Sequence, residues 1–320
     1  MNVISRPEAS QTEAPSDLAA ALAARIGRYR DKTFDMDAFP SNRGYKELER
    51  GQMRFVGAGG SPKVGDSETF PPGSFTVSLI HQEPGRFAAG HKHEIEESFL
   101  VFDGVLTVGW EQGGDAVEVR LGPKDLIMNA MDIAHGFRND DVKPILMSVM
   151  VGVGKPLPPV YTAHPKDTPL DRALKFGATR TLRLEQAGDH PLARLMAPQV
   201  VRYHDTTPIR DPGGFTRRVY VGAGAVPSRQ NRLELITLAP GEGVQAYNRP
   251  VEDAYFVMEG TLTVGWEKDG ATATRRIGAR DLLLTPAGQP RWFRNDSASA
   301  VEFMMVIGTP AADDFIHRPV

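Results

Sequence analysis

The chain has 320 residues, 41% of them hydrophobic and 24% charged, with a net charge of −3. This length predicts two domains, and the absence of any lysine or arginine run argues against nucleic acid and anionic membranes as partners. There is no cysteine, no secretory signal and no run of 18 apolar residues, which excludes disulfides and thiolate ligands and predicts a cytoplasmic protein without a membrane span.

The first element expected in chain order is a helix near the N-terminus. Residues 16–30 read SDLAAALAARIGRYR, and Leu18, Leu22 and Ile26 are spaced to form one apolar stripe. The polar residues before this segment are typical of a flexible arm. Residues 1–45 are therefore predicted to be an arm and a helix ahead of the first folded domain.

From residue 46 onward the pattern is typical of β-strands separated by glycine- and proline-rich turns. In FTVSLIHQE (75–83), alternation places Val77, Leu79 and His81 on one face, which we expect to point into the domain. The later segment ILMSVMV (145–151) is apolar on both faces, so one of them should pack against another sheet or subunit.

An internal repeat divides the chain into two copies of one fold. The segment GVLTVGWEQGG (104–114) recurs as GTLTVGWEKDG (260–270), with 8 of 11 residues identical at an offset of 156. The same offset aligns HGFRND (135–140) with RWFRND (291–296). We therefore predict an all-β chain with domains over 46–154 and 206–320, joined by a linker over 155–205.

The stretch GHKHEIEESF (90–99) carries the clearest chemical signal. On a strand, His91 and His93 point to the same side, and Glu97 has the same parity. His135, on a later expected strand, could bring a third imidazole to the same point. Three imidazole nitrogens and one carboxylate suit a divalent metal with exchangeable positions, such as Fe(II), Mn(II), Ni(II) or Zn(II).

These residues resemble the two sequence motifs of the cupin superfamily. The first motif, Gly-x5-His-x-His-x3-Glu-x6-Gly, is matched at every spacing by Gly85, His91, His93, Glu97 and Gly104. The second motif is matched by Gly122, His135 and Asn139, with Ala130 and Asp132 in place of its usual proline and glycine. The resemblance implies a double-stranded β-helix (jelly-roll) barrel in each copy, that is, a bicupin. It also implies that the metal ligands are His91, His93, Glu97 and His135.

The second copy lacks these ligands. At the offset of 156 it has Tyr247, Arg249, Asp253 and Arg291 in their places. Two guanidinium groups would repel a cation, so we expect one divalent metal per chain, bound in the first copy. The second copy is predicted to be a structural or dimerising domain, and a cationic pocket for a carboxylate is the alternative.

Further candidate residues surround the expected metal. His81 and Glu83 are titratable where the second copy has threonine and alanine, which makes them candidate catalytic groups for proton transfer. A rim histidine bonded to the backbone is an equally weighted interpretation of His81. No phosphate-loop pattern is present, so no organic cofactor is expected. The predicted apolar substrate pocket consists of Phe99, Met128, Met131, Phe137 and Met147.

The layout resembles gentisate-type ring-cleaving bicupins, but it retains the motif glutamate, as quercetin-dioxygenase-like and oxalate-decarboxylase-like cupins do. The leading hypothesis is an Fe(II)-dependent dioxygenase, an oxidoreductase that cleaves a C–C bond of a small aromatic, enol or β-diketone-type substrate with O₂. The alternatives are a redox-neutral Mn(II) or Zn(II) enzyme (decarboxylase, isomerase or aminohydrolase) and a non-catalytic protein that binds a small ligand. The expected partners are a small-molecule substrate and further copies of the chain, in a homodimer or higher oligomer.

Overall fold

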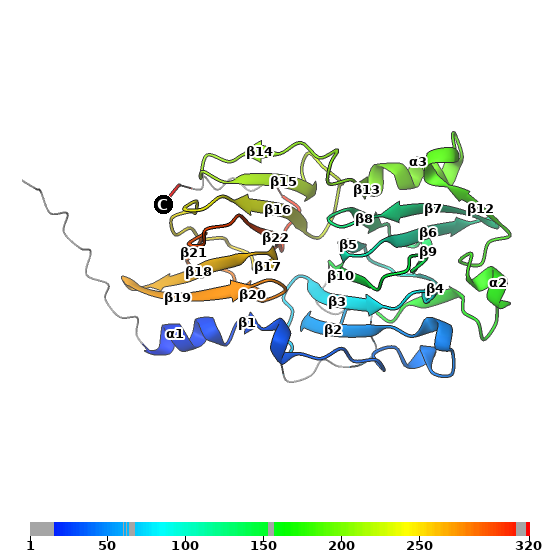
Figure 1. The fold of residues 1–320 in the computed structure, drawn as a ribbon, viewed down its shortest axis with the longest axis horizontal. Coiled ribbons are helices and arrows are strands. Elements are labelled where there is room, and N and C mark those ends of the chain that lie inside the picture. Colours follow the sequence, from blue (N-terminus) through cyan, green and yellow to red (C-terminus); the bar gives the residue numbers. More distant parts are fainter. Residues whose placement is uncertain (1–15, 60, 62, 64–67, 153–156, 312–317) are drawn as a thin grey trace, which may run out of the picture.

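The computed structural model describes residues 16–59, 61, 63, 68–152, 157–311 and 318–320. Two strand-rich barrels lie side by side along the long axis of the molecule (Figure 1). The all-β prediction with two tandem jelly-roll barrels is therefore confirmed. The flexible arm expected over residues 1–15 lies outside the described residues.

The first barrel contains two six-stranded sheets whose inner faces share one apolar core. One sheet, in the order β13-β8-β5-β10-β3-β2, consists of β2 (Gly51–Val56), β3 (Thr76–Gln82), β5 (Glu97–Asp103), β8 (Leu126–Asn129), β10 (Ile145–Val151) and β13 (Val200–Val201). The other, in the order β11-β4-β9-β6-β7-β12, consists of β4 (Phe87–Lys92), β6 (Leu106–Gln112), β7 (Asp115–Leu121), β9 (Ala134–Arg138), β11 (Val160–Ala163) and β12 (Arg180–Arg183).

The second barrel repeats this plan with a seven-stranded and a three-stranded sheet. The larger sheet, β1-β20-β17-β22-β16-β15-β14, consists of β1 (Ile26–Gly27), β14 (Ile209–Arg210), β15 (Thr216–Val221), β16 (Arg232–Leu238), β17 (Asp253–Glu259), β20 (Leu282–Thr285) and β22 (Val301–Ile307). The smaller sheet consists of β18 (Thr261–Lys268), β19 (Ala271–Gly278) and β21 (Arg291–Arg294). Strand β4 of the first barrel carries one of the paired histidines. In the second barrel, the described residues at the corresponding place form isolated β-bridges instead of a strand.

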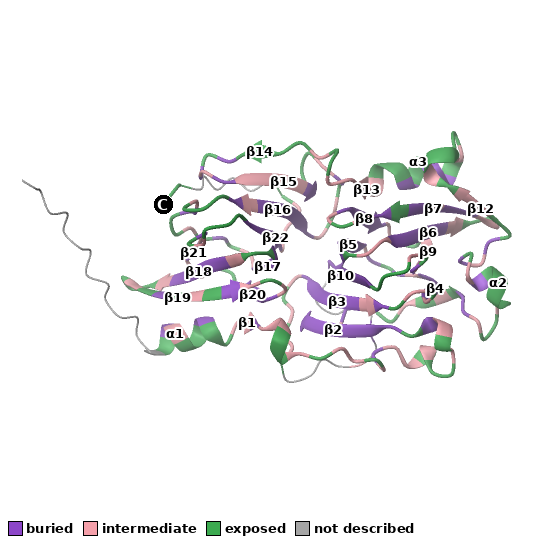
Figure 2. Ribbon diagram, viewed as in Figure 1, coloured by how far each residue is buried: buried purple, intermediate pink, exposed green. Residues whose placement is uncertain are grey.

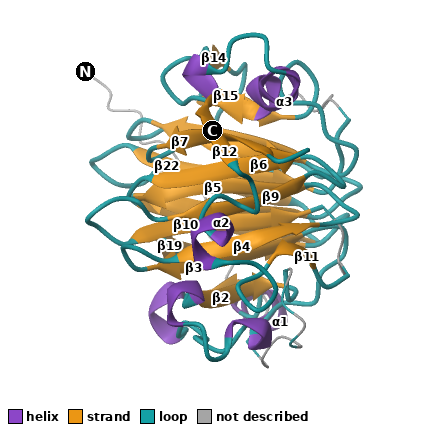
Figure 3. Ribbon diagram, turned by 90° about the vertical axis from the view of Figure 1, so that its right-hand side faces the viewer, coloured by secondary structure: helices purple, strands orange, loops and turns teal. Residues whose placement is uncertain are grey.

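The helices are short and lie around the strands (Figure 3). They are α1 (Ser16–Ala23), α2 (Leu170–Ala173) and α3 (Pro191–Met196), with 3-10 turns at Tyr29–Asp31, Pro40–Asn42, Lys46–Leu48, Leu184–Gln186 and Ala197–Gln199. None of the helices in the described part of the chain has the length and apolarity that a membrane crossing requires. The predicted helix is too long, because Ile26 and Gly27 leave it to pair with Leu283 and Leu282 of β20.

Two segments cross from one barrel to the other, and we term them the crossing arms (residues 16–31 and 191–203). Each arm lies directly before one barrel in the sequence but adds a strand to the other barrel. The first contributes β1 to the second barrel, next to β20, and the second contributes β13 to the first barrel, next to β8. Each arm ends in an Arg-Tyr pair whose guanidinium and backbone N–H bind one aspartate of the receiving barrel. These contacts join Arg28 and Tyr29 to Asp281, and Arg202 and Tyr203 to Asp125. The two barrels are therefore interlocked as well as packed together.

The largest apolar core lies between the barrels, and it corrects the orientation that we predicted for β3. Val77 and Leu79 point away from the first barrel and pack with side chains of the second, such as Leu235. Ser78 and Ile80 are the residues of this strand that face the interior of the first barrel. Figure 2 shows β3 buried along nearly its whole length. Both of its faces are covered in a tandem barrel, so alternation alone did not identify the inner one.

Candidate metal centre

Four side chains from neighbouring strands meet inside the first barrel. His91 lies in β4 and His93 directly follows that strand, while Glu97 begins β5 and His135 lies in β9. Strands β4 and β9 pair with His91 opposite His135, which brings the centroids of these two rings to 4.7 Å. All four side chains are buried. We refer to them as the histidine–glutamate cluster.

The distances within this cluster fit a single metal ion. Oε2 of Glu97 lies 3.1 Å from Nε2 of His135, 3.7 Å from that of His93 and 4.0 Å from that of His91. One ligand atom from each residue lies within 4.8 Å of all the others. Ligands held about 2.1 Å from one ion lie roughly 3.0 Å apart when adjacent and about 4.2 Å apart when opposite.

Backbone contacts orient two of the imidazoles for coordination. Nδ1 of His91 lies 2.8 Å from the carbonyl oxygen of Ala89, and Nδ1 of His135 lies 2.9 Å from that of Ile133. Since a carbonyl only accepts, each Nδ1 carries the proton and each Nε2 keeps its lone pair. This arrangement is typical of metal-ligating histidines.

His93 provides the test of whether a metal fits. Its ring is buried, yet among the described residues neither of its nitrogens has a hydrogen-bond partner. A buried polar group left unsatisfied costs about 1–3 kcal/mol, so such groups are rare without a missing partner. A metal ion bound to Nε2 would satisfy this ring at the position where the other donor atoms converge.

Burial sets the protonation states that a cation needs. It lowers the pKa of His91 well below the ordinary value, and it also lowers the pKa of His93. Burial raises the pKa of Glu97, but His93, His135 and His91 lower it further, to about 2. At neutral pH, His91 and His93 are therefore neutral and Glu97 is ionised, ready for a divalent cation.

These shifts predict that the metal is retained in mildly acidic solution. Because the pKa of His91 and of His93 is lowered, their neutral forms persist at pH values where a free imidazole is protonated. Metal content after equilibrium dialysis should stay constant from about pH 7.5 to about pH 6 and fall only at lower pH. Loss of half the metal already near about pH 6.5, the ordinary pKa of imidazole, would contradict this prediction when measured by elemental analysis.

The candidate catalytic residues are not brought to the cluster. His81 lies on the face of β3 opposite to the inward-facing Ile80, and its ring packs 5.4 Å from that of Phe34. Its Nε2 lies 3.8 Å from Oε1 of Glu83, and these side chains are 31% and 58% exposed. A proton-transfer role for His81 and Glu83 therefore finds no support in this geometry.

The cluster opens onto a small cavity of about 30 Å³. Of the predicted pocket residues, Phe99 and Phe137 line it. Met128 instead packs in the core between the barrels, and Met147 packs in the core of the first barrel. Met131 is half-buried and does not line the cavity. The geometry therefore gives no support to a methionine contribution to the pocket, because none of these three side chains lines the cavity.

Three polar residues that the sequence did not single out also line this cavity: Arg50, Gln52 and Tyr161. Arg50 and Gln52 come from the start of β2, and Tyr161 comes from β11, which pairs with β4. None of them belongs to a recognisable motif. The internal repeat could have pointed to Arg50. When VGAGG (56–60) is aligned with VGAGA (221–225), Arg50 aligns with an apolar residue, Phe215, so a charged residue occurs here only in the first copy.

In the second barrel, arginines stand at the positions that correspond to His93 and His135. Nη1 of Arg249 lies 2.8 Å from Oδ2 of Asp253, and Nη2 of Arg291 lies 2.8 Å from the same oxygen. All three side chains are buried. In the alternative interpretation these arginines would bind the carboxylate of a ligand, but here they bind a carboxylate of the chain itself, which favours the structural interpretation of this barrel.

Comparison with known proteins places this geometry in context. Residues 234–307 match the family model described as Cupin domain, and no curated protein sequence matches the chain. The oxalate decarboxylase of Bacillus subtilis, in a single-residue mutant, superposes with a TM-score of 0.65 at 14% identity, over 92% of this chain and 78% of that one. That of Lactobacillus farciminis, in a formate complex, gives 0.62 at 13% identity, over 92% and 87%.

These findings correct our leading hypothesis. These similar solved structures are decarboxylases, which are lyases, so the prediction of an oxidoreductase (a dioxygenase) is wrong. The preference for Fe(II) and the use of O₂ have no support in these comparisons. Another structure of the Bacillus subtilis enzyme, with a TM-score of 0.63 at 14% identity over 90% of this chain and 78% of that one, concerns its Mn(II) centres. The retained Glu97 had already separated this chain from the gentisate type. The resemblance read from the sequence is confirmed: residues 234–307 match the Cupin domain model, and the whole chain has the fold of two cupin-type barrels in tandem.

Proposed function

We propose that the chain is a Mn(II)-dependent, redox-neutral enzyme that decarboxylates a small organic acid in its first barrel. The observation that carries this proposal is the buried histidine–glutamate cluster, whose donor atoms converge at the wall of a small cavity. A bound divalent metal would hold a substrate carboxylate and stabilise negative charge that develops as the reaction proceeds. The four proposed ligands are His91, His93, Glu97 and His135.

Manganese is proposed over iron on two grounds. Three imidazoles and one carboxylate form a donor set that accepts Mn(II) without a thiolate or an unusual geometry. One of the similar structures, of the Bacillus subtilis oxalate decarboxylase, comes from work on the Mn(II) centres of that enzyme.

The reaction itself needs neither an oxidant nor a reductant. The bond between the carboxylate carbon and its neighbour breaks, CO₂ leaves, and the electron pair that stays on the neighbour takes up a proton. Phe99 and Phe137 line the cavity and would exclude water, which favours the loss of a charged carboxylate as neutral CO₂. The acid must be small, because the cavity is only about 30 Å³.

Tyr161 is our candidate for the proton donor. It lines the cavity, and its hydroxyl lies 2.7 Å from Oγ of Ser41 in a contact that reaches solvent. This pair of hydroxyls connects the cavity to water outside the barrel. Tyr161 thereby takes the role that the sequence suggested for His81 and Glu83, which lie elsewhere.

The test combines elemental analysis with an assay for CO₂ release. The protein should retain close to one Mn(II) per chain after reconstitution and release CO₂ from at least one acid in a panel of two- to four-carbon carboxylic acids. A fully loaded protein that binds such acids without releasing CO₂ would be a non-catalytic binding protein instead. A protein that retains no metal would contradict the proposal entirely.

The expected homodimer or higher oligomer and the cytoplasmic location stay predictions. Sedimentation velocity on the full chain tests the first, and fractionation of the source cells tests the second.

A further inference from the structure

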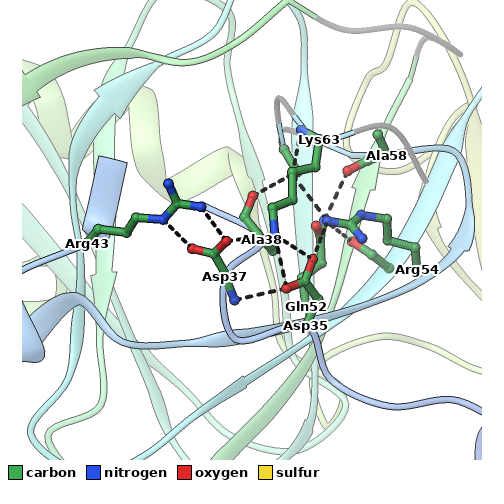
Figure 4. Close-up of polar contacts among 10 residues, drawn as sticks. Asp35, Asp37, Ala38, Arg43, Gln52, Arg54, Ala58 and Lys63 are labelled. Carbon is green, nitrogen blue, oxygen red and sulfur yellow. Dashed lines mark hydrogen bonds and ion pairs between the residues drawn. The ribbon is translucent and has the colours of Figure 1, made fainter. Parts of the chain in front are cut away.

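Three buried polar side chains occupy alternate positions in β2 and just before it: Arg50, Gln52 and Arg54. Two of them have partners within the chain, as Figure 4 shows. Nη2 of Arg54 lies 3.2 Å from Oδ2 of Asp35, and Nε2 of Gln52 donates to the carbonyl oxygen of Ala58 at 3.1 Å. The positive charge of Arg54 is therefore balanced inside the fold.

Arg50 has no carboxylate partner of this kind among the described residues, although its side chain interacts with that of Tyr161. It is 6% exposed, its Nη1 makes no hydrogen bond to any described residue, and no described carboxylate forms an ion pair with it. Its guanidinium lies 4.1 Å from the ring centroid of Phe39 and 5.7 Å from that of Phe137. Arginine is almost never buried without a counter-ion, because its desolvation costs several kcal/mol. Its position in the cavity wall points to a missing anion.

The second barrel offers an internal control for this position. Gly51 pairs with His81 in the first barrel, and Thr216 pairs with Thr237 in the second, so the registers of the two copies agree at the offset of 156 between His81 and Thr237. The residue before Thr216 is Phe215, whose ring lies 5.6 Å from that of Phe293, the counterpart of Phe137. The fold therefore accepts an apolar ring here, and the cation occurs only beside the histidine–glutamate cluster.

The charges around the cavity favour a doubly charged ligand. A divalent metal would bring two positive charges, Glu97 removes one, and Arg50 adds one. Burial lowers the pKa of the Arg50 guanidinium, against the opposing effects of Tyr161 and Glu97, and an anion in the cavity would relieve this cost. A ligand with two carboxylates would leave the loaded site close to neutral.

We propose that Arg50 anchors the second carboxylate of a dicarboxylate substrate of two to four carbons, while the first carboxylate binds the metal. This inference rests on the proposed function for the metal end of the substrate. It adds a specificity-determining residue from the start of β2, outside both cupin motifs. The free Nη1 of Arg50 and the cavity of about 30 Å³ suit a short, planar anion better than a neutral or long one.

The experiment is a calorimetric titration of the Mn(II)-loaded full chain with oxalate, malonate and succinate, with acetate as the single-carboxylate control. Arg50→Met should weaken binding of the tightest dicarboxylate about 10- to 100-fold while changing acetate binding less than about threefold. Arg50→Lys keeps the charge but not the paired donors, so its affinity should lie between the two. Each variant must hold the same Mn(II) content as the unmodified chain, which also checks that the barrel has folded.

Equal dicarboxylate affinity in Arg50→Met and in the unmodified chain would overturn the inference. So would a variant that loses acetate and dicarboxylate binding in the same proportion. If Arg50→Met does not fold, an unchanged dicarboxylate preference in Arg50→Lys would overturn it equally. The experiment measures binding and not turnover. If the chain releases no CO₂ but its dicarboxylate affinity depends on Arg50, only the proposed reaction is refuted. A chain that releases CO₂ without this dependence refutes only the anchor.

Discussion

Replacing His93 by alanine should abolish stoichiometric metal binding while leaving the free energy of unfolding of the metal-free protein nearly unchanged. The metal affinity should fall by at least about 100-fold, because a direct ligand contributes more than the outer hydrogen bonds that support one. The fold should tolerate the change, since neither ring nitrogen of His93 has a hydrogen-bond partner among the described residues. Elemental analysis after dialysis gives the first quantity, and urea denaturation of the metal-free protein gives the second.

Two further variants serve as comparisons for His93→Ala. His204→Ala removes an exposed histidine outside the cluster and should change neither quantity. His91→Ala should also lose the metal, but it additionally removes the bond to the carbonyl oxygen of Ala89. Full metal content in His93→Ala would show that the cluster is not the metal site.

Replacing Asp253 by asparagine should be among the most damaging single substitutions in the second barrel. This carboxylate is the counter-ion of both Arg249 and Arg291, and all three side chains are buried. Removing its charge takes from two buried guanidinium groups the carboxylate that they share, which should cost about 3–5 kcal/mol of unfolding free energy. The cost should appear as a lower denaturation midpoint in urea, measured without metal so that the first barrel contributes equally.

Asp296→Asn is the control for that experiment. Asp296 also pairs with an arginine, Arg294, but these two side chains are 35% and 38% exposed. Loss of this surface pair should cost less than about 1 kcal/mol. Similar losses for Asp253→Asn and Asp296→Asn would mean that the buried triad does not stabilise the second barrel.

The histidine–glutamate cluster could be predicted because its information is local. His91, His93 and Glu97 lie within seven residues, and strand periodicity alone directs them to one side. His135 is remote in sequence, but the repeat and the second motif identified its strand. The fold was predictable for the same reason, since two aligned copies show twice where the strands and turns fall.

The rest of the site could not be predicted, because it depends on which strands become neighbours. Arg50 and Tyr161 reach the cavity from the start of β2 and from β11, at the edges of two different sheets, and no spacing relates them to the cluster. His81 was misplaced because the more apolar face of β3 is covered by the other barrel rather than by its own interior. Both errors follow from the tertiary packing of faces that periodicity treats as equivalent.

The crossing arms have a consequence for the history and the handling of this chain. Two identical single-barrel chains that exchanged their N-terminal arms would form a symmetric dimer with this same arrangement. The chain therefore has the architecture of such a dimer joined end to end, with β1 and β13 as the exchanged strands. Covalent joining permits a difference that identical subunits cannot have: one half carries the histidine–glutamate cluster, and the other half carries arginines and an aspartate at the matching positions. It also means that a chain cut in the linker would separate each barrel from a strand that its partner carries.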